Sequence, residues 1–281
     1  MKIVALLIVL MIMVFSLVTA ITPGSKRYED KNPVAKIGKE IAKPFSQVDN
    51  IGSELSQALE RNGVKLPSIT GDNDKPVGDY VLQNHTAAIF SGLDLPSANF
   101  AGAVVSSAQF DNALLDSANL EGASGDDVNF SRARMAKANL NAAMFRNSDL
   151  SGAELREAVA RASDFAGSKF TGGDLSFASF SGANLTGADM TDIYGAGAIF
   201  TGADLRNVLF TKADLTGVRF DRAVLKDANF SGAELNAASF NGARLHGADL
   251  SGALNLSTEQ LAKSCSDAST KLPDHIIAPR C

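Results

Sequence analysis

The sequence predicts an all-β solenoid over most of the chain, and three observations lead to this prediction. Small and large apolar residues recur at a period of five from Ala88 onward, without an insertion. Glycine gathers at a third position of the same period. A period of five fits neither an α-helix, which repeats every ~3.6 residues, nor a strand, which repeats every ~2. A chain that turns a corner every five residues explains the pattern, and four corners close one coil of twenty residues.

The inward positions supply the predicted core. Between residues 88 and 253, 25 of the 34 residues whose numbers end in 3 or 8 are Ala. Between 90 and 250, the 33 residues whose numbers end in 0 or 5 include 14 Leu and 13 Phe. Residues twenty apart are expected to stack, and each buried ring contributes about 2–3 kcal/mol. The expected core ladder is Phe180, Phe200, Phe220 and Phe240, and a second ladder on the opposite face runs from Phe90, Phe110 and Phe130 to Phe170, Phe210 and Phe230.

The three remaining positions of each unit are expected to face water. Asp or Asn commonly precedes the large residue, and Ser, Thr, Arg or Gly follows it. From residue 92 to residue 252, fifteen glycines have numbers ending in 2 or 7. A tight corner at these positions would need a positive φ, which glycine adopts most readily.

Individual units have a recognisable form. The segments Ala183-Asn184-Leu185-Thr186-Gly187 and Ala203-Asp204-Leu205-Arg206-Asn207 resemble the pentapeptide repeat family, whose pattern is A(D/N)LXX. The resemblance covers about residues 86–255 and implies a right-handed quadrilateral β-helix there. It implies no chemistry, because one fold hosts unrelated roles. One branch of the family, the gyrase-protecting proteins of quinolone resistance, resembles DNA in shape and charge.

Residues 1–20 are typical of a signal peptide. Met1 and Lys2 give a positive start, an uncharged apolar run follows, and Val18-Thr19-Ala20 places small residues at a cleavage site. The alternative is an uncleaved anchor, because residues 3–20 are just long enough to span a thinned bilayer. Both interpretations place the rest of the chain outside the cytoplasm, in the periplasm or the exterior. Membrane contact is expected only if residues 3–20 remain attached.

The two ends of a solenoid expose unpaired strand edges, so both are expected to be covered. Residues 21–85 predict a helical segment and a linker, because apolar residues recur every three or four positions from Val34 to Leu59. This segment either folds over the first coil or binds a partner. Residues 256–281 predict a C-terminal cap, in which Ser257-Thr258-Glu259-Gln260 is a capping box that opens a helix to about Ser264.

The chain has two cysteines, Cys265 and Cys281. In an oxidising compartment they are expected to form a disulfide that pins the tail over the last coil and contributes up to ~3 kcal/mol. The alternative is a metal site made from Cys265, His275 and Cys281. Because their spacing matches no zinc pattern, the sequence predicts no metal.

The sequence favours a non-enzymatic role. The 26 basic and 31 acidic side chains give a net charge of −5, which argues against binding through nucleic-acid phosphates. His85 is expected before the first coil, His246 on an outward position and His275 in the tail, so no catalytic triad and no cofactor are predicted. The predicted function is an exported structural or interaction module of the cell envelope with a protein partner.

Two other functions stay open at this point. A DNA mimic that binds gyrase would need a strongly acidic rod, whereas residues 86–255 hold 19 acidic and 13 basic side chains. B-DNA carries about one charge per 1.7 Å, which amounts to many more negative charges over the same length. An accessory protein of an enzyme is the other alternative.

Phe177 and Tyr194 form the candidate interaction patch. Phe177 is an aromatic residue at an outward corner position, and the residue twenty positions later is Gly197. Tyr194 is also outward, beside the missing large residue at Gly195. Aromatic residues are enriched among interface anchors, which favours a recognition surface. The alternative is that Phe177 merely lies flat over Gly197 and covers it.

Overall fold

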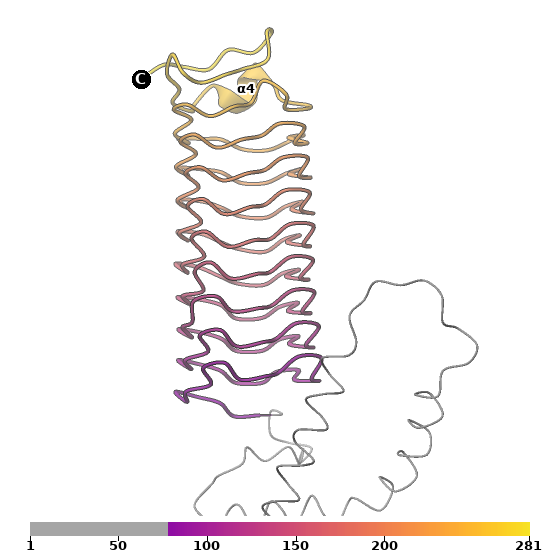
Figure 1. Ribbon diagram of the computed structural model, residues 1–281. Coiled ribbons are helices and arrows are strands. Elements are labelled where there is room, and N and C mark those ends of the chain that lie inside the picture. Colours follow the sequence, from indigo (N-terminus) through magenta and orange to yellow (C-terminus); the bar gives the residue numbers. More distant parts are fainter. Residues whose placement is uncertain (1–77) are drawn as a thin grey trace, which may run out of the picture. The chain divides into compact units, whose positions relative to one another are not determined.

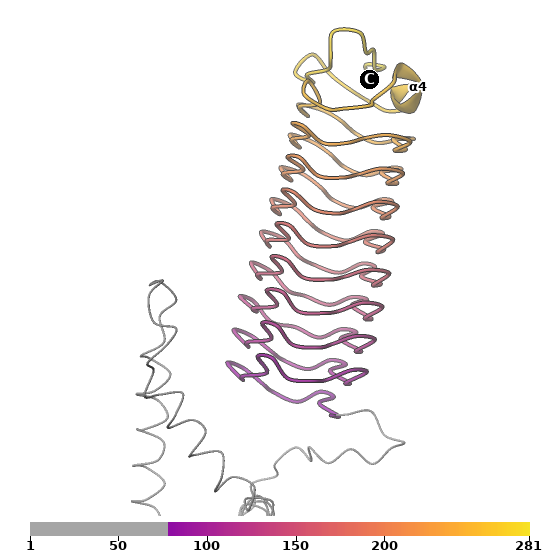
Figure 2. The same ribbon diagram turned by 90° about the vertical axis from the view of Figure 1, so that its right-hand side faces the viewer.

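The structure, a computed structural model, describes residues 78–281, which wind into a stack of coils under a short cap (Figures 1 and 2). Parallel bridges join each residue ending in 4 or 9 to the residue twenty positions later, from Asp79–Asn99 to Glu234–Leu254. The predicted solenoid and its coil length are therefore confirmed. The expected signal peptide and the helical segment before residue 78 lie outside the described residues. Within residues 78–281, no helix is long and apolar enough to cross a bilayer.

Every corner of the coils has the same backbone conformation. All residues ending in 2 or 7 from Leu82 to Gly247 have φ between 52° and 71°, and only fourteen of these 34 are Gly. The N–H of the small residue closes most corners on the carbonyl of the large one, as Ala203 does on Phe200 at 3.0 Å. The left-handed conformation costs a side-chain-bearing residue about 1 kcal/mol. At twenty corners, corner closure and the stacking of the coils outweigh that cost.

Neighbouring coils are joined by backbone hydrogen bonds on both sides of the large residue. Phe200 N–H donates to Arg219 O at 2.8 Å, and Gly202 N–H donates to Asp221 O at 2.8 Å. The N–H of the residue that follows the large residue makes no hydrogen bond to a backbone carbonyl in the coils. At many units the Asp or Asn before the large residue accepts from it; Asp149 Oδ1, for example, accepts from Ser151 N–H at 2.9 Å. These Asp and Asn residues therefore satisfy the turn as well as face water.

The phenylalanines form one connected aromatic core. Rings twenty residues apart stack, with centroid distances of 5.5 Å for Phe180–Phe200 and for Phe200–Phe220, and of 5.2 Å for Phe220–Phe240. The second expected ladder lies on the opposite wall, half a coil away, and its rings meet those of the first edge to face, as Phe200 and Phe210 do at 6.0 Å. All four ladder side chains are fully buried.

The first coil begins earlier than the sequence suggested, so the expected boundary at residue 86 is wrong. Asp79 and Asn84 already bridge to the next coil, and the Tyr80 ring stacks on Phe100 at 4.3 Å. His85 does not precede the coil; it takes an inward position, with its ring 5.2 Å from Tyr80. Its Nε2 is buried without a hydrogen-bond partner, and burial lowers the pKa of His85.

The cap is built from α4 (Thr258–Leu261) and the tail that follows it (Figure 1). The helix begins after the capping box at Ser257 but ends three residues before the expected Ser264. Gln260 Nε2 also donates to the carbonyls of Leu235 at 2.7 Å and Ala238 at 2.9 Å, which ties α4 to the last full coil. After α4 the spacing lengthens, since Arg244 bridges to Cys265 and Asp249 to Lys271.

The inward register can be tested with two identical substitutions at adjacent residues. Phe200→Asp places a charge in the dry aromatic core and should lower stability by more than about 4 kcal/mol. Ile199→Asp should leave stability unchanged or raise it slightly. Thr201 Oγ1 is buried without a hydrogen-bond partner, and a carboxylate at residue 199 could accept a hydrogen bond from it. Thermal melting of both variants checks this.

The outward positions give a second comparison. Asn184→Ala and Asp204→Ala should lower stability by about 1 kcal/mol each. Equal losses of stability at residues 184, 199, 200 and 204 would contradict the register.

Because His85 is partly buried in the first coil, we expect the stability of that coil to depend on pH. Because the folded state lowers its pKa, the stability that neutral His85 contributes is fully present above its ordinary pKa of ~6.5 and is lost as the pH falls below that value. The melting temperature of the wild type, relative to that of His85→Phe, should therefore fall between about pH 8 and pH 5. A constant difference across that range would show that the imidazole does not control the first coil.

Candidate functional site

The aromatic patch, Phe177 and Tyr194, lies on two neighbouring coils. Phe177 N–H donates to Ala196 O at 3.0 Å, so the corner carrying Phe177 sits directly beside the segment that carries Tyr194. The two side chains are 61% and 62% exposed. Phe177 occupies a corner with φ of 59°. Nineteen other corners from residue 82 to residue 247 also carry a side chain in this conformation, and Phe177 is the only aromatic residue among them.

The Phe177 ring rests on Gly197. A Cβ at Gly197 would lie 2.8 Å from two atoms of that ring, so no other residue fits there without moving it. The ring thus covers the glycine, as the packing interpretation expects. It also stays mostly exposed, as the recognition interpretation requires. The two interpretations are therefore compatible in this structure.

The gap expected behind Tyr194 is filled by its neighbours. A Cβ at Gly195 would lie 3.3 Å from Ile193 Cδ1 and 3.3 Å from Leu215 Cδ2. Ile193 is fully buried at a position where most units have Ala. In this unit the small position carries the large residue Ile193 and the large position carries Gly195, so the core beneath Tyr194 stays packed.

A second feature is a groove at the C-terminal end of the rod, which we call the cap groove. Its volume is about 610 Å³, and it is lined by Asp204, Arg206, Val224, Lys226, Arg244, His246 and Asp267. Arg206 Nη2 lies 2.6 Å from Asp204 Oδ2. Burial alone would raise the pKa of Asp204, but hydrogen bonds from Arg206 and Thr186 outweigh it and the pKa lies below its usual value. Positive and negative charges nearly cancel in the cap groove, so charge alone selects no ligand.

Asp267 shapes the floor of the cap groove. Its carboxylate accepts from the Ser269 hydroxyl at 2.7 Å, from Gly247 N–H at 3.2 Å and from Thr270 N–H at 3.0 Å. These bonds, led by that of Ser269, hold the pKa of Asp267 far below its usual range. Asp267 therefore orders the loop of the tail just after Cys265.

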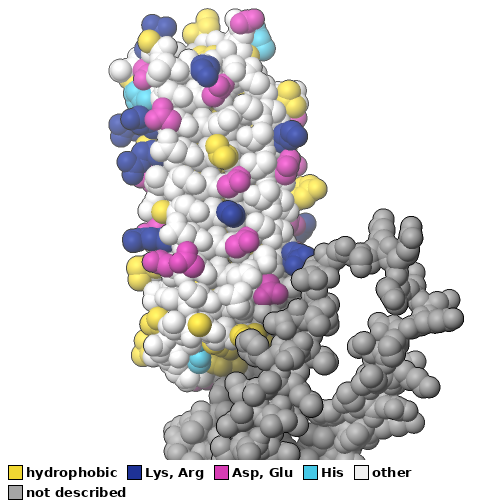
Figure 3. All heavy atoms as spheres, in the orientation of Figure 1, with side chains coloured by type: hydrophobic (Ala, Val, Ile, Leu, Met, Phe, Trp, Pro, Cys, Tyr) yellow, Lys and Arg dark blue, Asp and Glu magenta, His cyan; other side chains and the backbone are white. Residues whose placement is uncertain are grey.

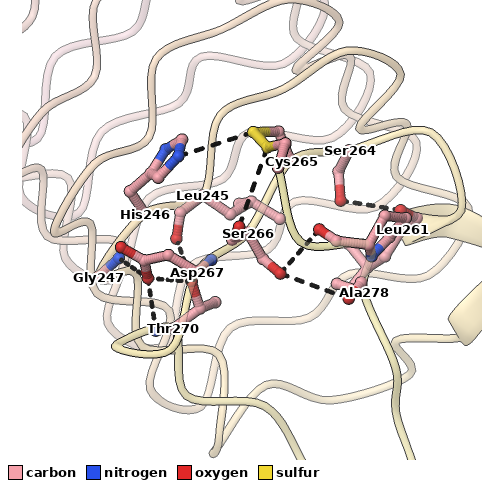
Figure 4. Close-up of a disulfide and its surroundings, with 12 residues drawn as sticks. Leu245, His246, Gly247, Leu261, Ser264, Cys265, Ser266, Asp267, Thr270 and Ala278 are labelled. Atoms are coloured by element: carbon pink, nitrogen blue, oxygen red, sulfur yellow. Dashed lines mark hydrogen bonds between the residues drawn. A yellow bond between two sulfur atoms is a disulfide. The ribbon is translucent and has the colours of Figure 1, made fainter.

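The structure pairs Cys265 with Cys281, and their Cα atoms are 5.6 Å apart. The alternative ligand set with His275 is not brought together. Instead His246 Nε2 lies 3.6 Å from Cys265 Sγ, and Figure 4 shows its ring turned toward the sulfur. The sequence indicated His246 only as an outward residue of the last coils. Its approach to Cys265 depends on the lengthened spacing after α4, which no repeat pattern reports.

Comparison with known proteins agrees with this geometry. The family model described as "Pentapeptide repeats" matches eight copies, which together span residues 94–159, 161–194 and 196–254. The chain belongs to the pentapeptide repeat family. A comparison with curated proteins gave no significant match.

Solved pentapeptide repeat structures resemble the rod. QnrB1, a plasmid-mediated fluoroquinolone resistance protein, is 20% identical with a TM-score of 0.54, over 66% of this chain and 94% of its own. HetL, from the cyanobacterium Nostoc sp. strain PCC 7120 and involved in heterocyst differentiation regulation, is 27% identical with a TM-score of 0.32, over 72% and 88%. A pentapeptide repeat protein of the Arabidopsis thaliana thylakoid lumen is 25% identical with a TM-score of 0.17, over 46% and 69%. The likeness to QnrB1 shows the fold alone.

Two glycine corners of this pentapeptide repeat protein form a matched pair. Gly187 and Gly197 both have φ of 69°, but a Cβ at Gly187 meets nothing within 4 Å. Gly187→Ala should lower stability by about 1 kcal/mol through backbone strain alone. Gly197→Ala should cost a further ~0.5–1 kcal/mol, because it displaces the Phe177 ring. In a Phe177→Ala background the two costs should become equal by denaturant unfolding; a difference that persists would mean that the ring does not pack on Gly197.

Proposed function

We propose that this protein is an exported, non-enzymatic interaction module of the cell envelope that binds a protein partner through the aromatic patch. One observation carries the proposal: Phe177 is the one aromatic residue at a corner of the described coils, and its ring stays mostly exposed beside the exposed Tyr194. Residues 1–20 support export, and a disulfide between Cys265 and Cys281 suits an oxidising compartment.

The exposed part of the Phe177 ring is available for recognition. Fourteen corners carry Gly, and the other twenty, Phe177 among them, accept the strain of about 1 kcal/mol that a side chain brings. The part of the Phe177 ring that packs on Gly197 offsets that strain, but 61% of its surface stays in water. A partner that covered the exposed face of the ring would recover the remaining apolar burial. Tyr194 adds a second amphipathic ring whose hydroxyl is available to a partner.

The surroundings of the patch resemble the polar rim of an interface. Asp174 and Asp214 bridge to Tyr194 from the coils on either side. Asp174 is joined to Arg156 at 3.6 Å. An aromatic centre with charged residues at its edge is a usual arrangement of a protein interface.

A DNA mimic that binds gyrase is less well supported. Nine ion pairs within residues 78–281 join acidic side chains to Lys or Arg. In Figure 3, dark blue and magenta side chains occur side by side along the visible face of the rod. A stripe of unpaired negative charge, which mimicry of the phosphate backbone needs, is absent from the described surface seen there.

The proposal is tested with the double variant Phe177→Ala, Tyr194→Ala. The mature protein is isolated from its producing cells, its first residue is determined, and cross-linked partners are quantified by mass spectrometry. The variant should keep its melting temperature within a few degrees and lose at least one partner that the wild type captures.

The matched control is Met144→Ala, Leu209→Ala, which removes two other exposed apolar side chains, 47% and 41% exposed. The control should retain the partner. Equal capture by the wild type and the patch variant, or a large drop in the melting temperature of the patch variant, would reduce the patch to packing. A captured enzyme would point to the accessory role, and protection of gyrase supercoiling would point to the DNA mimic.

A further inference from the structure

Three potential metal-ligand atoms converge where the tail meets the rod. His246 Nε2, Cys265 Sγ and Cys281 Sγ all lie within 4.8 Å of one another. His246 and Cys265 are partly buried, whereas Cys281 is exposed. We propose that, when the Cys265–Cys281 disulfide is reduced, these three residues form a binding site for Zn²⁺ or a similar borderline divalent cation.

The distance between the imidazole and the nearer sulfur already fits. In a tetrahedral zinc site, Zn–S of ~2.3 Å and Zn–N of ~2.0–2.1 Å set the S···N separation at about 3.6 Å and the S···S separation at about 3.8 Å. His246 Nε2 lies 3.6 Å from Cys265 Sγ. One edge of the coordination tetrahedron is therefore formed before any metal binds, and its sulfur and nitrogen come from two successive layers of the rod.

Cys265 and His246 are held in place by the backbone of the rod. Cys265 N–H donates to Ala243 O at 2.8 Å, and Leu245 N–H donates to Cys265 O at 2.7 Å. His246 follows Leu245, whose side chain is fully buried, so its Cα position is fixed by the last full coil. Two of the three ligands thus belong to the rigid end of the solenoid.

Cys281 is the ligand that has to move. Its N–H donates to Ser266 O at 3.3 Å, and the residue is exposed. After reduction the two sulfurs need to separate only to about 3.8 Å, a change that side-chain rotation from Cα atoms 5.6 Å apart accommodates. The fourth coordination position faces solvent and takes a water molecule, as in zinc sites with three protein ligands.

Reduction of the Cys265–Cys281 disulfide precedes metal binding. A dithiol reductant gives two electrons and two protons to the disulfide, which becomes two thiols while the dithiol becomes a disulfide. Zn²⁺ then displaces the two thiol protons and accepts a lone pair from the neutral imidazole, whose remaining proton is on Nδ1. The tail is thereby fastened in both states, by a covalent bond when oxidised and by coordination when reduced.

Metal binding by the full-length protein tests the site. The chain is reduced with a trialkylphosphine, which takes an oxygen atom from water and does not compete for zinc as a thiol would. It is then titrated without oxygen, with Zn²⁺ against a chromophoric chelator and with Co²⁺ as a spectroscopic probe. The reduced wild type should bind one ion per chain and give a thiolate–Co²⁺ charge-transfer band, and the oxidised protein should bind none.

Two histidine variants identify the nitrogen ligand. His246→Asn should weaken binding by about tenfold or more, because one of three protein ligands is lost. His275→Asn, a matched change in the tail, should leave binding unchanged, and Cys281→Ser should abolish the charge-transfer band. No binding by the reduced wild type, or equal binding by His246→Asn, would overturn the proposal. A loss with His275→Asn alone would do so too.

Protection of the tail gives a second readout. Lys271 is exposed and lies in the segment that Cys281 fastens, so trypsin should cut there slowly in the oxidised protein. Cleavage should quicken in the reduced, metal-free protein and slow again when Zn²⁺ is added. Equal cleavage of the reduced protein with and without Zn²⁺ would show that the cation does not fasten the tail.

Discussion

The whole rod depends on one geometric constraint: after twenty residues the backbone must return to the same place, one strand spacing further along the axis. Four left-handed corners meet this constraint in each coil, and they do so even where the corner residue is not glycine. Once the coil closes, columns of like residues follow, and with them the stacked rings of the core and the Asx side chains that satisfy the free amides. Where the spacing changes after α4, columns end and the cap begins.

Closure also explains why local departures are tolerated. A unit can lack the large residue when the residue at its small position is bulkier, as Ile193 is beside Gly195. Phe145 and Phe165, on a third wall, continue the aromatic core between Phe130 and Phe170 where the other walls carry smaller residues. The rod therefore conserves the volume inside each coil rather than the residue at each position.

The period of five was enough to predict the solenoid, its coil length and its inward columns, because those features depend on spacing alone. The first coil was missed because Gln83 stands where a small residue is expected and Tyr80 and His85 where Phe or Leu is usual. The aromatic patch was visible as an exception to the repeat, but the contact of Phe177 with Gly197 needed coordinates to measure. His246 could not be assigned, since it meets Cys265 only through the extra residue between Arg244 and its bridge partner.

The four-cornered coil has a consequence for how such a chain changes in evolution. Duplication or deletion of a twenty-residue block lengthens or shortens the rod and leaves every wall in alignment. Deletion of a single five-residue unit also preserves the inward pattern, but it turns everything downstream by a quarter revolution about the axis. The cap groove lies on the wall opposite Tyr194, because Asp204 is half a coil away, so a unit lost between these two residues would turn the groove onto an adjacent wall. Surfaces on this fold can be re-aimed relative to one another by small indels without unfolding the protein.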